Sequence, residues 1–487
     1  MTKKQTFGLS LLLLLSALLG FGSLTSGHNW AYSDFASYIM QAESILDGNL
    51  EGFVAHNTIT IEESDVPVGP IAYPWGYPLM LAPIISLMGI STLSMKLLNT
   101  LLFLLFLLTF FFLLRKRLPY LDSLLLTALF AFNPVFLEAQ DSILSDLPFL
   151  FFSTFAIFLM DDRDSARPPD KIAYLKQSLI GGIIFFAFFI RTNGLLLLLS
   201  LFAYEILRLV KLKTSFSELK KQILLLATPY LTFILLWGLT SLIFPDGQAS
   251  HLSHYQNFHF SQLGDYLLFY TNLGEEFFAE IVFAKIIYLL FGFFFFVGIF
   301  LKSKENILFI LYFFFTVALY ISWPHKQGIR FLFPILPFFF YLALQGFRVV
   351  PLKKSKIASL FPRLILAALI LVFFVISTLN LRENLLHPQE SNGPFDEVSI
   401  ELFEYIKKTL PEKSRVVFFK PRVMRLMTDR DSILILSCEN LPRGEYLVIN
   451  KKWEDMGQIA PDEAKSCSVG LEKLFWNRRF ILYHIAP

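Results

Sequence analysis

The sequence predicts an α-helical polytopic membrane protein with about eleven transmembrane helices, an amphipathic first outer loop and a small C-terminal α/β domain. The chain has 487 residues, of which 55% are hydrophobic and 17% are charged, whereas soluble domains carry about 25% charged residues. Its mean hydropathy is +0.57. Several apolar runs exceed about 18 residues, a length that indicates a membrane-spanning helix. The net charge of +3 is too small to indicate a nucleic-acid partner.

The apolar runs have the lengths expected of membrane spans. The first run follows Lys3 and Lys4 and shows no clear small-residue cleavage site, so we expect an uncleaved span, with a cleaved signal peptide as the alternative. The stretch 74–91 is apolar but contains three prolines, so we expect it to be half-embedded. The expected spans lie near 7–26, 93–114, 121–138, 147–160, 176–190, 194–210, 222–244, 282–301, 306–323, 331–347 and 363–380.

Basic residues orient these spans. With this order of spans, the basic clusters all fall on the same face as Lys3 and Lys4. Cytoplasmic loops are enriched in Lys and Arg, so this face and the N-terminus are predicted to be cytoplasmic. Everything after residue 380 then lies outside the cytoplasm. The clusters contain Arg115, Lys116, Arg117, Lys211, Lys213, Lys220, Lys221, Lys302, Lys304, Lys353, Lys354 and Lys356.

We expect two domains. Residues 1–380 form a transmembrane catalytic domain whose outer loop 27–92 carries a candidate active-site acid. Residues 381–487 form an extracytoplasmic α/β domain, because they are charged and contain strand-like runs such as RVVFFK and YLVIN. Cys438 and Cys467 both lie there. An oxidising compartment would allow a disulfide between them, and two reduced buried thiols are the alternative.

Asp34 begins a segment with helical spacing, AYSDFASYIMQAESILDGN. Ser33 is expected to cap this helix, with Asp34, Tyr38 and Gln41 on its polar face and the opposite, apolar face toward the membrane. The simplest role of Asp34 is to offset the helix dipole. Further charged and aromatic side chains are expected near the same membrane face, where charge close to hydrocarbon indicates function, with anchoring or ion pairing as the alternative. They are Tyr73, Trp75, Tyr77, Asp141, Asp146, Arg191, His325, Lys326 and Arg330.

The order of these motifs resembles that of the GT-C superfamily of integral-membrane glycosyltransferases. The most similar subset comprises bacterial relatives of protein O-mannosyltransferases and of lipid A aminoarabinose transferases. The resemblance rests on the acid after the first span, on YPWGYPLMLAP, SDLPF, RTNGLLLL and RFLFPILP, and on the extracytoplasmic tail. It covers essentially the whole chain.

The resemblance implies roles for the acids. Asp34 takes the place of the catalytic carboxylate in the first outer loop. The family often has two adjacent acids there, whereas Asp34 lies between Ser33 and Phe35. Asp146 matches a second acid at the next outer turn, and Asp141 is its rival.

The resemblance also implies substrate-binding residues. Tyr73 and Tyr77 belong to the proline-rich segment that helps to shape the active-site loop. Arg330 matches the basic residues that hold the lipid phosphate, followed by Arg191 and Lys326. A fixed arginine can bind a phosphate leaving group through two parallel hydrogen bonds, and a carboxylate can take the proton of the attacking hydroxyl.

We therefore predict an inverting glycosyltransferase of the bacterial cytoplasmic (inner) membrane. Its donor would be a polyprenyl-phosphate sugar, and its acceptor a hydroxyl of lipid A, a polysaccharide or a protein. One alternative is a membrane transporter or lipid-linked glycan flippase, although the charges favour span ends. A glycan ligase or polymerase that uses a diphosphate donor is another.

A divalent metal is left open by the sequence. His251 and His254 are spaced as HxxH in the predicted outer loop 245–281. Loop histidines with no companion motif are usually polar surface residues, which is the alternative for this pair.

Overall fold

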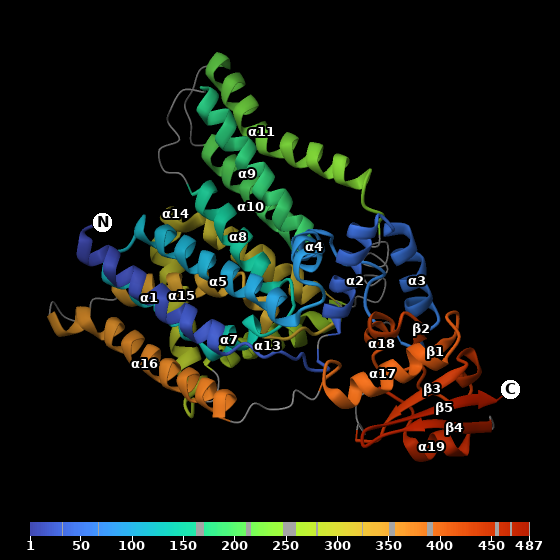
Figure 1. Ribbon diagram of the computed structural model, residues 1–487. Coiled ribbons are helices and arrows are strands. Elements are labelled where there is room, and N and C mark those ends of the chain that lie inside the picture. Colours follow the sequence, from blue (N-terminus) through green and yellow to red (C-terminus); the bar gives the residue numbers. More distant parts are fainter. Residues whose placement is uncertain are drawn as a thin grey trace. The chain divides into compact units, whose positions relative to one another are not determined.

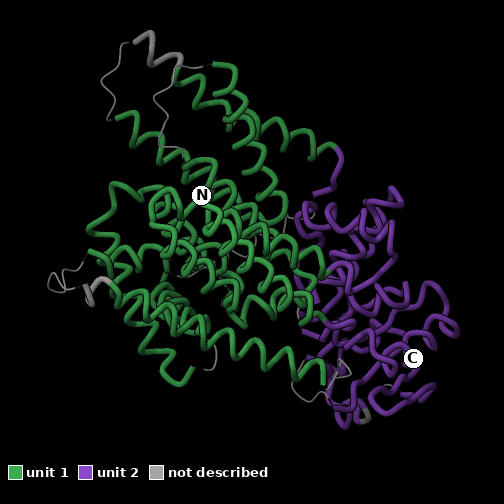
Figure 2. The backbone as a smooth tube through the Cα atoms, turned by 60° about the vertical axis from the view of Figure 1, so that its left-hand side comes forward, with its two compact units in different colours: residues 1–24, 96–242, 253–387 green, residues 25–95, 243–252, 388–487 purple. Residues whose placement is uncertain are grey.

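The computed structural model describes residues 1–31, 33–66, 68–161, 170–210, 216–246, 260–278, 281–323, 325–349, 356–386, 393–452, 457–467 and 470–486. These residues are mostly helical (Figure 1) and form two compact units (Figure 2). Unit 1 comprises Met1–Leu24, Lys96–Leu242 and Ser253–His387. Unit 2 comprises Thr25–Met95, Ile243–Leu252 and Pro388–Pro487, so it joins the predicted first outer loop to the C-terminal residues.

Unit 1 is built from apolar helices, because a backbone in hydrocarbon must satisfy its own hydrogen bonds. Among the described residues, seven helices are long and apolar enough to cross a membrane, and the bent pair α6–α7 would make an eighth. The predicted class, a multi-pass α-helical membrane protein, is confirmed. The helices lying wholly or mostly in unit 1 are α1 (Lys3–Gly22), α5 (Thr92–Arg115), α6 (Tyr120–Ala131), α7 (Pro134–Gln140), α8 (Asp146–Met160), α9 (Lys171–Ile190), α10 (Leu195–Leu209), α11 (Phe216–Ser241), α13 (Leu263–Leu273), α14 (Ala284–Ser322), α15 (Leu336–Val349) and α16 (Lys356–Leu386), with short 3₁₀ turns η1 (Thr192–Gly194), η3 (Phe260–Gln262), η4 (Gly274–Phe278) and η5 (Ile329–Leu332).

Each predicted span falls on one of these helices, and one of the predicted spans is divided between two helices. The predicted spans 282–301 and 306–323 correspond to the two parts of α14, which meet at a kink with non-helical backbone at Lys302 and Asn306. The predicted span 121–138 is divided between α6 and α7, whose axes differ by 56°. Helices α8 and α15 have 15 and 14 residues, fewer than the roughly 20 that usually cross a bilayer.

The bend between α6 and α7 has a local cause. The side chain of Asn133 accepts a hydrogen bond from the backbone N–H of Val135 at 2.9 Å. Pro134 follows as the first residue of α7, where its missing N–H costs no hydrogen bond. The Asn133 amide also donates to the carbonyl of Phe277 at 2.8 Å, so the break supplies a contact to η4.

Helices α14 and α15 approach each other through glycine. A Cβ atom added to Gly298 would overlap the carbonyl oxygen of Leu342, and one added to Gly346 would overlap that of Phe294. Small residues permit this approach between membrane helices. The rings of Phe294 and Phe347 stack beside it, with their centroids 3.7 Å apart.

The helices of unit 2 are α2 (Asp34–Asp47), α3 (Leu50–Glu62), α4 (Gly76–Met88), α17 (Glu397–Thr409), α18 (Pro421–Thr428) and α19 (Pro461–Ser466), with the short turn η6 (Leu441–Arg443). Its strands are β1 (Arg415–Val417), β2 (Asp431–Ile433), β3 (Tyr446–Asn450), β4 (Gly470–Trp476) and β5 (Phe480–Ala486). They form a five-stranded sheet in the order β2-β1-β3-β5-β4. Strand β1 is parallel to β2 and β3, and β5 is antiparallel to β3 and β4. The predicted small C-terminal α/β domain is thus confirmed.

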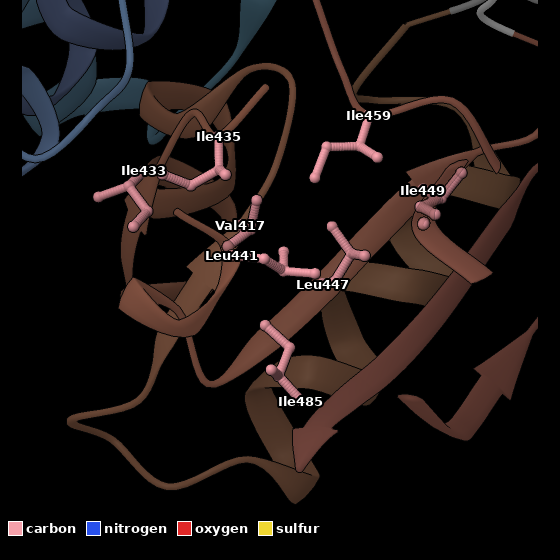
Figure 3. Close-up of a cluster of buried hydrophobic side chains, with 9 residues drawn as sticks. Val417, Ile433, Ile435, Leu441, Leu447, Ile449, Ile459 and Ile485 are labelled. Atoms are coloured by element: carbon pink, nitrogen blue, oxygen red, sulfur yellow. The ribbon is translucent and has the colours of Figure 1, made fainter. Parts of the chain in front are cut away.

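A cluster of branched aliphatic side chains forms the core beside this sheet. Figure 3 shows these side chains gathered next to the strands, among them Val417 from β1 and Ile485 from β5. Cys467 packs against the cluster and is joined by a disulfide to Cys438. The structure therefore has the bonded form of the two cysteines. The buried members are Val417, Ile433, Ile435, Leu441, Leu447, Ile449, Ile459, Ala464 and Ile485.

Residues at the end of α3 cover the edge of strand β2. The hydroxyl of Thr60 donates to the carbonyl of Ser432 at 2.8 Å. The N–H of Asp65 donates to the carbonyl of Leu434 at 2.9 Å, and the N–H of Leu434 donates to the hydroxyl of Ser64 at 2.8 Å. An edge strand offers unpaired backbone groups, so this pairing attaches the first loop to the sheet.

Trp30 provides a second attachment within unit 2. Its ring is fully buried, with ring centroids 5.9 Å from Phe418, 5.0 Å from Phe419 and 6.2 Å from Phe480. Burial of a large aromatic ring among other rings contributes a few kcal/mol. The segment that leads into α2 is therefore fixed on the C-terminal part of the chain.

Helix α2 differs from its prediction. Its residues 35–42 are all buried within unit 2, although the sequence predicts one buried face. Leu46, near the end of the helix, is 44% exposed. The extra burial arises because α3, α4 and α18 all pack against α2. Ser33 occupies the N-cap position, but its backbone is helical and its side chain makes no capping hydrogen bond to the described residues, so the predicted cap is wrong.

The close approach of α14 and α15 predicts that replacing glycine by alanine has opposite effects on stability at two positions of α14. Gly298→Ala should lower the thermal midpoint, because its Cβ must displace a backbone carbonyl, which costs about 1–3 kcal/mol. Gly292→Ala is the control: no atom lies within 4 Å of its Cβ position, and alanine favours a helix over glycine by about 0.5–1 kcal/mol. Thermal unfolding of both variants in detergent would measure the difference. Equal midpoints would contradict the glycine contact.

Candidate functional site

A directed chain of hydrogen bonds ends on the carboxylate of Asp34 in unit 2. The hydroxyl of Tyr73 donates to Asp34 Oδ1 at 2.7 Å. The same hydroxyl accepts a hydrogen bond from Nη1 of Arg422, on α18, at 3.2 Å. A donor whose own oxygen is polarised by a guanidinium favours the ionised form of the carboxyl group that it meets.

Side chains on the polar face of α2 also contact Tyr73, through its backbone and its ring. The Gln41 side-chain amide donates to the carbonyl of Tyr73 at 2.9 Å, and its oxygen accepts from the Tyr73 N–H at 3.1 Å. The ring of Tyr38 lies 4.9 Å from that of Tyr73 and 5.0 Å, edge to face, from that of Tyr77. Asp34, Tyr38 and Gln41 therefore share the predicted polar face, and that face contacts the segment that contains Tyr73 and Tyr77.

Arg422 is enclosed by the turn that precedes Tyr73. Its side chain is 1% exposed, and its Nη2 donates to the carbonyl of Pro70. Gly69 has φ +120°, and a Cβ there would lie 2.7 Å from Nη1 of Arg422. Glycine is needed at this position both for its backbone conformation and for the space that it leaves to the guanidinium.

The surroundings of Asp34 shift two pKa values. Burial raises the pKa of Tyr73 well above its usual range, the negative charge of Asp34 raises it further, and Arg422 opposes the shift. Tyr73 therefore stays protonated and keeps its donor at any physiological pH. Burial lowers the pKa of Lys420, while the charge of Asp34 acts in the opposite direction. Lys420 is thus within electrostatic range of the same carboxylate.

A second charged cluster lies in unit 1. Asp146, the first residue of α8, is 4% exposed. Arg191, at the end of α9, donates to its Oδ1, and Arg330, in η5, donates to its Oδ2 at 3.4 Å. Both guanidinium groups also face the ring of Phe331, at 4.5 Å and 5.4 Å from its centroid. Two cations and one carboxylate are therefore held together by packing as well as by charge. We call Asp146, Arg191 and Arg330 the arginine triad.

The other two candidates in unit 1 lie outside the arginine triad. Asp141 forms an ion pair with Lys96 at 2.8 Å, and the Lys96 side chain is fully buried. Lys326 is exposed, with its ammonium group 5.2 Å from the ring of Phe269. The structure thus brings together Asp146, Arg191 and Arg330, and it gives Asp141 and Lys326 different neighbours.

The metal candidates His251 and His254 lie outside the described residues. Within the described ranges, no group of three or more His, Cys, Asp or Glu side chains is arranged to hold a metal ion.

Sequence reasoning missed the residues that reach these carboxylates from elsewhere in the chain. Lys96 did carry a signal, because it is a lone cation in an apolar run. Arg422 carried none: it is separated from Tyr73 by 349 positions and lies in a charged segment of ordinary appearance. Gln41 was placed on the correct face, but its partner was not predicted.

Comparison with solved structures assigns the fold. The chain is similar to ArnT from Cupriavidus metallidurans bound to undecaprenyl phosphate, with 12% identity, a TM-score of 0.57 and coverage of 97% of each chain. For the apo structure of the same ArnT, the sequence identity is 11%, the TM-score is 0.59 and 98% of each chain is covered. The chain is also similar to the archaeal oligosaccharyltransferase AglB from Archaeoglobus fulgidus, in complex with an inhibitory peptide and a dolichol-phosphate. Here the sequence identity is 10% and the TM-score is 0.57, over 97% of this chain and 73% of that chain.

No protein-family model and no curated protein sequence matches the chain. Both structures match over nearly the whole chain, so the chain shares the fold of ArnT and AglB, and the predicted resemblance is confirmed at the level of the fold.

The arginine triad makes Asp146 a sensitive position for stability. Asp146→Asn leaves two guanidinium groups around a neutral amide, which should destabilise the protein by about 3–5 kcal/mol. Glu404→Gln is the control, because it removes an exposed ion pair with Lys408, and surface pairs contribute little. The thermal midpoints of both variants would be compared with that of the wild type. An unchanged midpoint for Asp146→Asn would show that the carboxylate does not balance the arginines.

Proposed function

We propose that the protein is an inverting glycosyltransferase that moves a sugar from a polyprenyl-phosphate donor to a hydroxyl of an extracytoplasmic acceptor. The arginine triad carries this proposal, because two guanidinium groups converge in a chain that shares its fold with ArnT, whose structure was determined with undecaprenyl phosphate. Lipid A, a polysaccharide or a protein would supply the acceptor hydroxyl. The proposed location is a bacterial cytoplasmic membrane, with the N-terminus in the cytoplasm.

On the donor side, the arginine triad is suited to a phosphate leaving group. As the bond between the sugar and the phosphate breaks, negative charge grows on the phosphate oxygen. Arginine binds such oxygens through its planar fork. Asp146 would then act as a positioning residue that orients both guanidinium groups before the donor arrives, which avoids reorganisation during the reaction. The Phe-rich helices of unit 1 suit an apolar lipid chain.

On the acceptor side, Asp34 is suited to general-base catalysis. The acceptor oxygen forms a bond to the anomeric carbon, and the bond from that carbon to the phosphate oxygen breaks. The hydroxyl proton passes to Asp34, and polyprenyl phosphate leaves with the electron pair of the broken bond. The segment with Tyr73 and Tyr77 shapes the surroundings of Asp34.

Two other functions would use similar groups. A transporter or flippase is disfavoured by the fold shared with ArnT and AglB. A ligase or polymerase would use a lipid diphosphate, which the arginine triad could also bind, so a panel of donors has to separate these two reactions.

The arginine triad predicts a strict need for arginine at position 330. Arg330→Lys keeps the charge but loses the fork, so donor use should fall on the order of tenfold. Arg330→Ala should reduce it further, by about 10²–10³-fold. The assay is release of free polyprenyl phosphate from reconstituted protein given a panel of polyprenyl-phosphate and polyprenyl-diphosphate sugars.

Arg348→Lys is the matched control for Arg330→Lys. Arg348 and Arg363 converge on buried Asp122, at 3.7 Å and 2.6 Å, so this substitution changes a similar cluster outside the arginine triad and should keep wild-type release. Equal release by the wild type and both Arg330 variants would remove Arg330 from donor binding. Vesicle transport with no release from any donor would favour the transporter.

Asp34 is predicted to act in the chemical step. Asp34→Asn should lower kcat on the order of 10²–10⁴-fold and change the donor KM much less. The measurement is initial rate against donor concentration, with the thermal midpoint recorded to verify folding. A folded variant with near-normal kcat would remove Asp34 from the mechanism.

A further inference from the structure

We propose that Tyr73 and Arg422 are positioning residues for Asp34, and that the C-terminal part of the chain is in this way required for the chemical step. This inference rests on the proposed role of Asp34 as the general base. Tyr73 would fix the carboxylate through its hydroxyl, and Arg422 would act through Tyr73.

Arg422 has few hydrogen-bond acceptors for a buried cation. Its guanidinium is buried, and in the described part of the chain its hydrogen-bond acceptors are the hydroxyl of Tyr73 and the carbonyl of Pro70. A buried cation is costly unless a negative charge balances it. The carboxylate of Asp34, on the other side of the Tyr73 hydroxyl, is placed to balance it.

A second arginine in the same part of the chain shows the contrast. Arg430 is also buried, at 6% exposure. It donates to three backbone carbonyls, those of Thr428, Lys407 and Leu410, at 3.0–3.1 Å. Two of these carbonyls lie at the C-terminal end of α17, so Arg430 stabilises a helix end. Arg430 contacts neither Tyr73 nor Asp34 through these bonds, whereas Arg422 reaches the phenol that donates to the proposed base.

The chain of hydrogen bonds from Arg422 through Tyr73 acts on the carboxylate of Asp34. A donor at 2.7 Å fixes the orientation of Asp34 and stabilises its ionised form. Arg422 polarises the Tyr73 hydroxyl and strengthens that donor. The base would then stay ionised to lower pH and stay aligned for the acceptor hydroxyl. Loss of either partner should therefore change kcat and its pH dependence together.

The test measures kcat and KM against pH for the full-length reconstituted protein. Tyr73→Phe keeps the ring against Tyr38 and the backbone bonds to Gln41, and it removes only the hydroxyl. We expect kcat to fall on the order of tenfold, with KM for the donor nearly unchanged. The acid limb of the kcat profile should move to higher pH, because a carboxylate that loses a donor takes up its proton more readily.

Arg422→Met should give the same direction of change, and Arg422→Lys should restore part of it by keeping the charge. The double variant Tyr73→Phe/Arg422→Met should have the kcat of Tyr73→Phe alone, because Arg422 acts through the hydroxyl. Arg430→Met is the control: it should lower the thermal midpoint and leave the acid limb in place.

The outcomes separate the inference from the proposed function. If Asp34→Asn is inactive while the acid limb of folded Tyr73→Phe and Arg422→Lys stays unshifted, the inference is wrong and the role of Asp34 stands. If Asp34→Asn retains normal kcat, the proposed base is wrong and the inference falls with it. An acid limb that moves equally in Arg430→Met would show a general effect of destabilisation and would also overturn the inference.

Discussion

The arrangement of unit 2 depends on how one buried guanidinium is satisfied. Arg422 lies inside the turn that contains Gly69 and Pro70, and it reaches the hydroxyl of Tyr73. A buried charge restricts its surroundings more than an apolar side chain does, because each donor requires an acceptor at a defined place. The turn, the tyrosine and Asp34 are therefore positioned by one group that belongs to a distant part of the sequence.

Asp34, Asp141 and Asp146 differ in the groups that donate hydrogen bonds to them. Asp146 accepts directly from Arg191 and Arg330, and Asp141 pairs directly with Lys96. A carboxylate that accepts from two guanidinium groups holds both of them in a fixed orientation. Asp34 accepts from the Tyr73 hydroxyl, which itself accepts from Arg422, so a neutral phenol orients it. These contacts agree with the proposal that Asp34 is the base and that Asp146 orients the arginines.

Local sequence patterns predicted the helices and strands, but they could not predict contacts between residues that are far apart in the sequence. Helical spacing placed Asp34, Tyr38 and Gln41 on one face of α2, and apolar length indicated the spans. The kink in α14, at Lys302 and Asn306, falls at the predicted boundary between two spans, where charged residues interrupt the apolar sequence. Asp141 and Asp146 share one turn, so only their contacts with Lys96 or with the arginines could separate them. The partner of Tyr73 could not be deduced from spacing.

The covered edge of β2 has a consequence for biosynthesis. Thr60 and its partner Ser432 are separated by 372 positions, so the first loop is made long before the strand that receives it. At about 5–20 residues per second, the interval is on the order of a minute. During that time the backbone groups of the early segment and the ring of Trp30 lack their partners in the sheet. A protein truncated before residue 415 would keep the apolar helices but would lack the sheet to which the first loop is attached. The first loop can therefore reach its place on the sheet only after the C-terminal strands have been made.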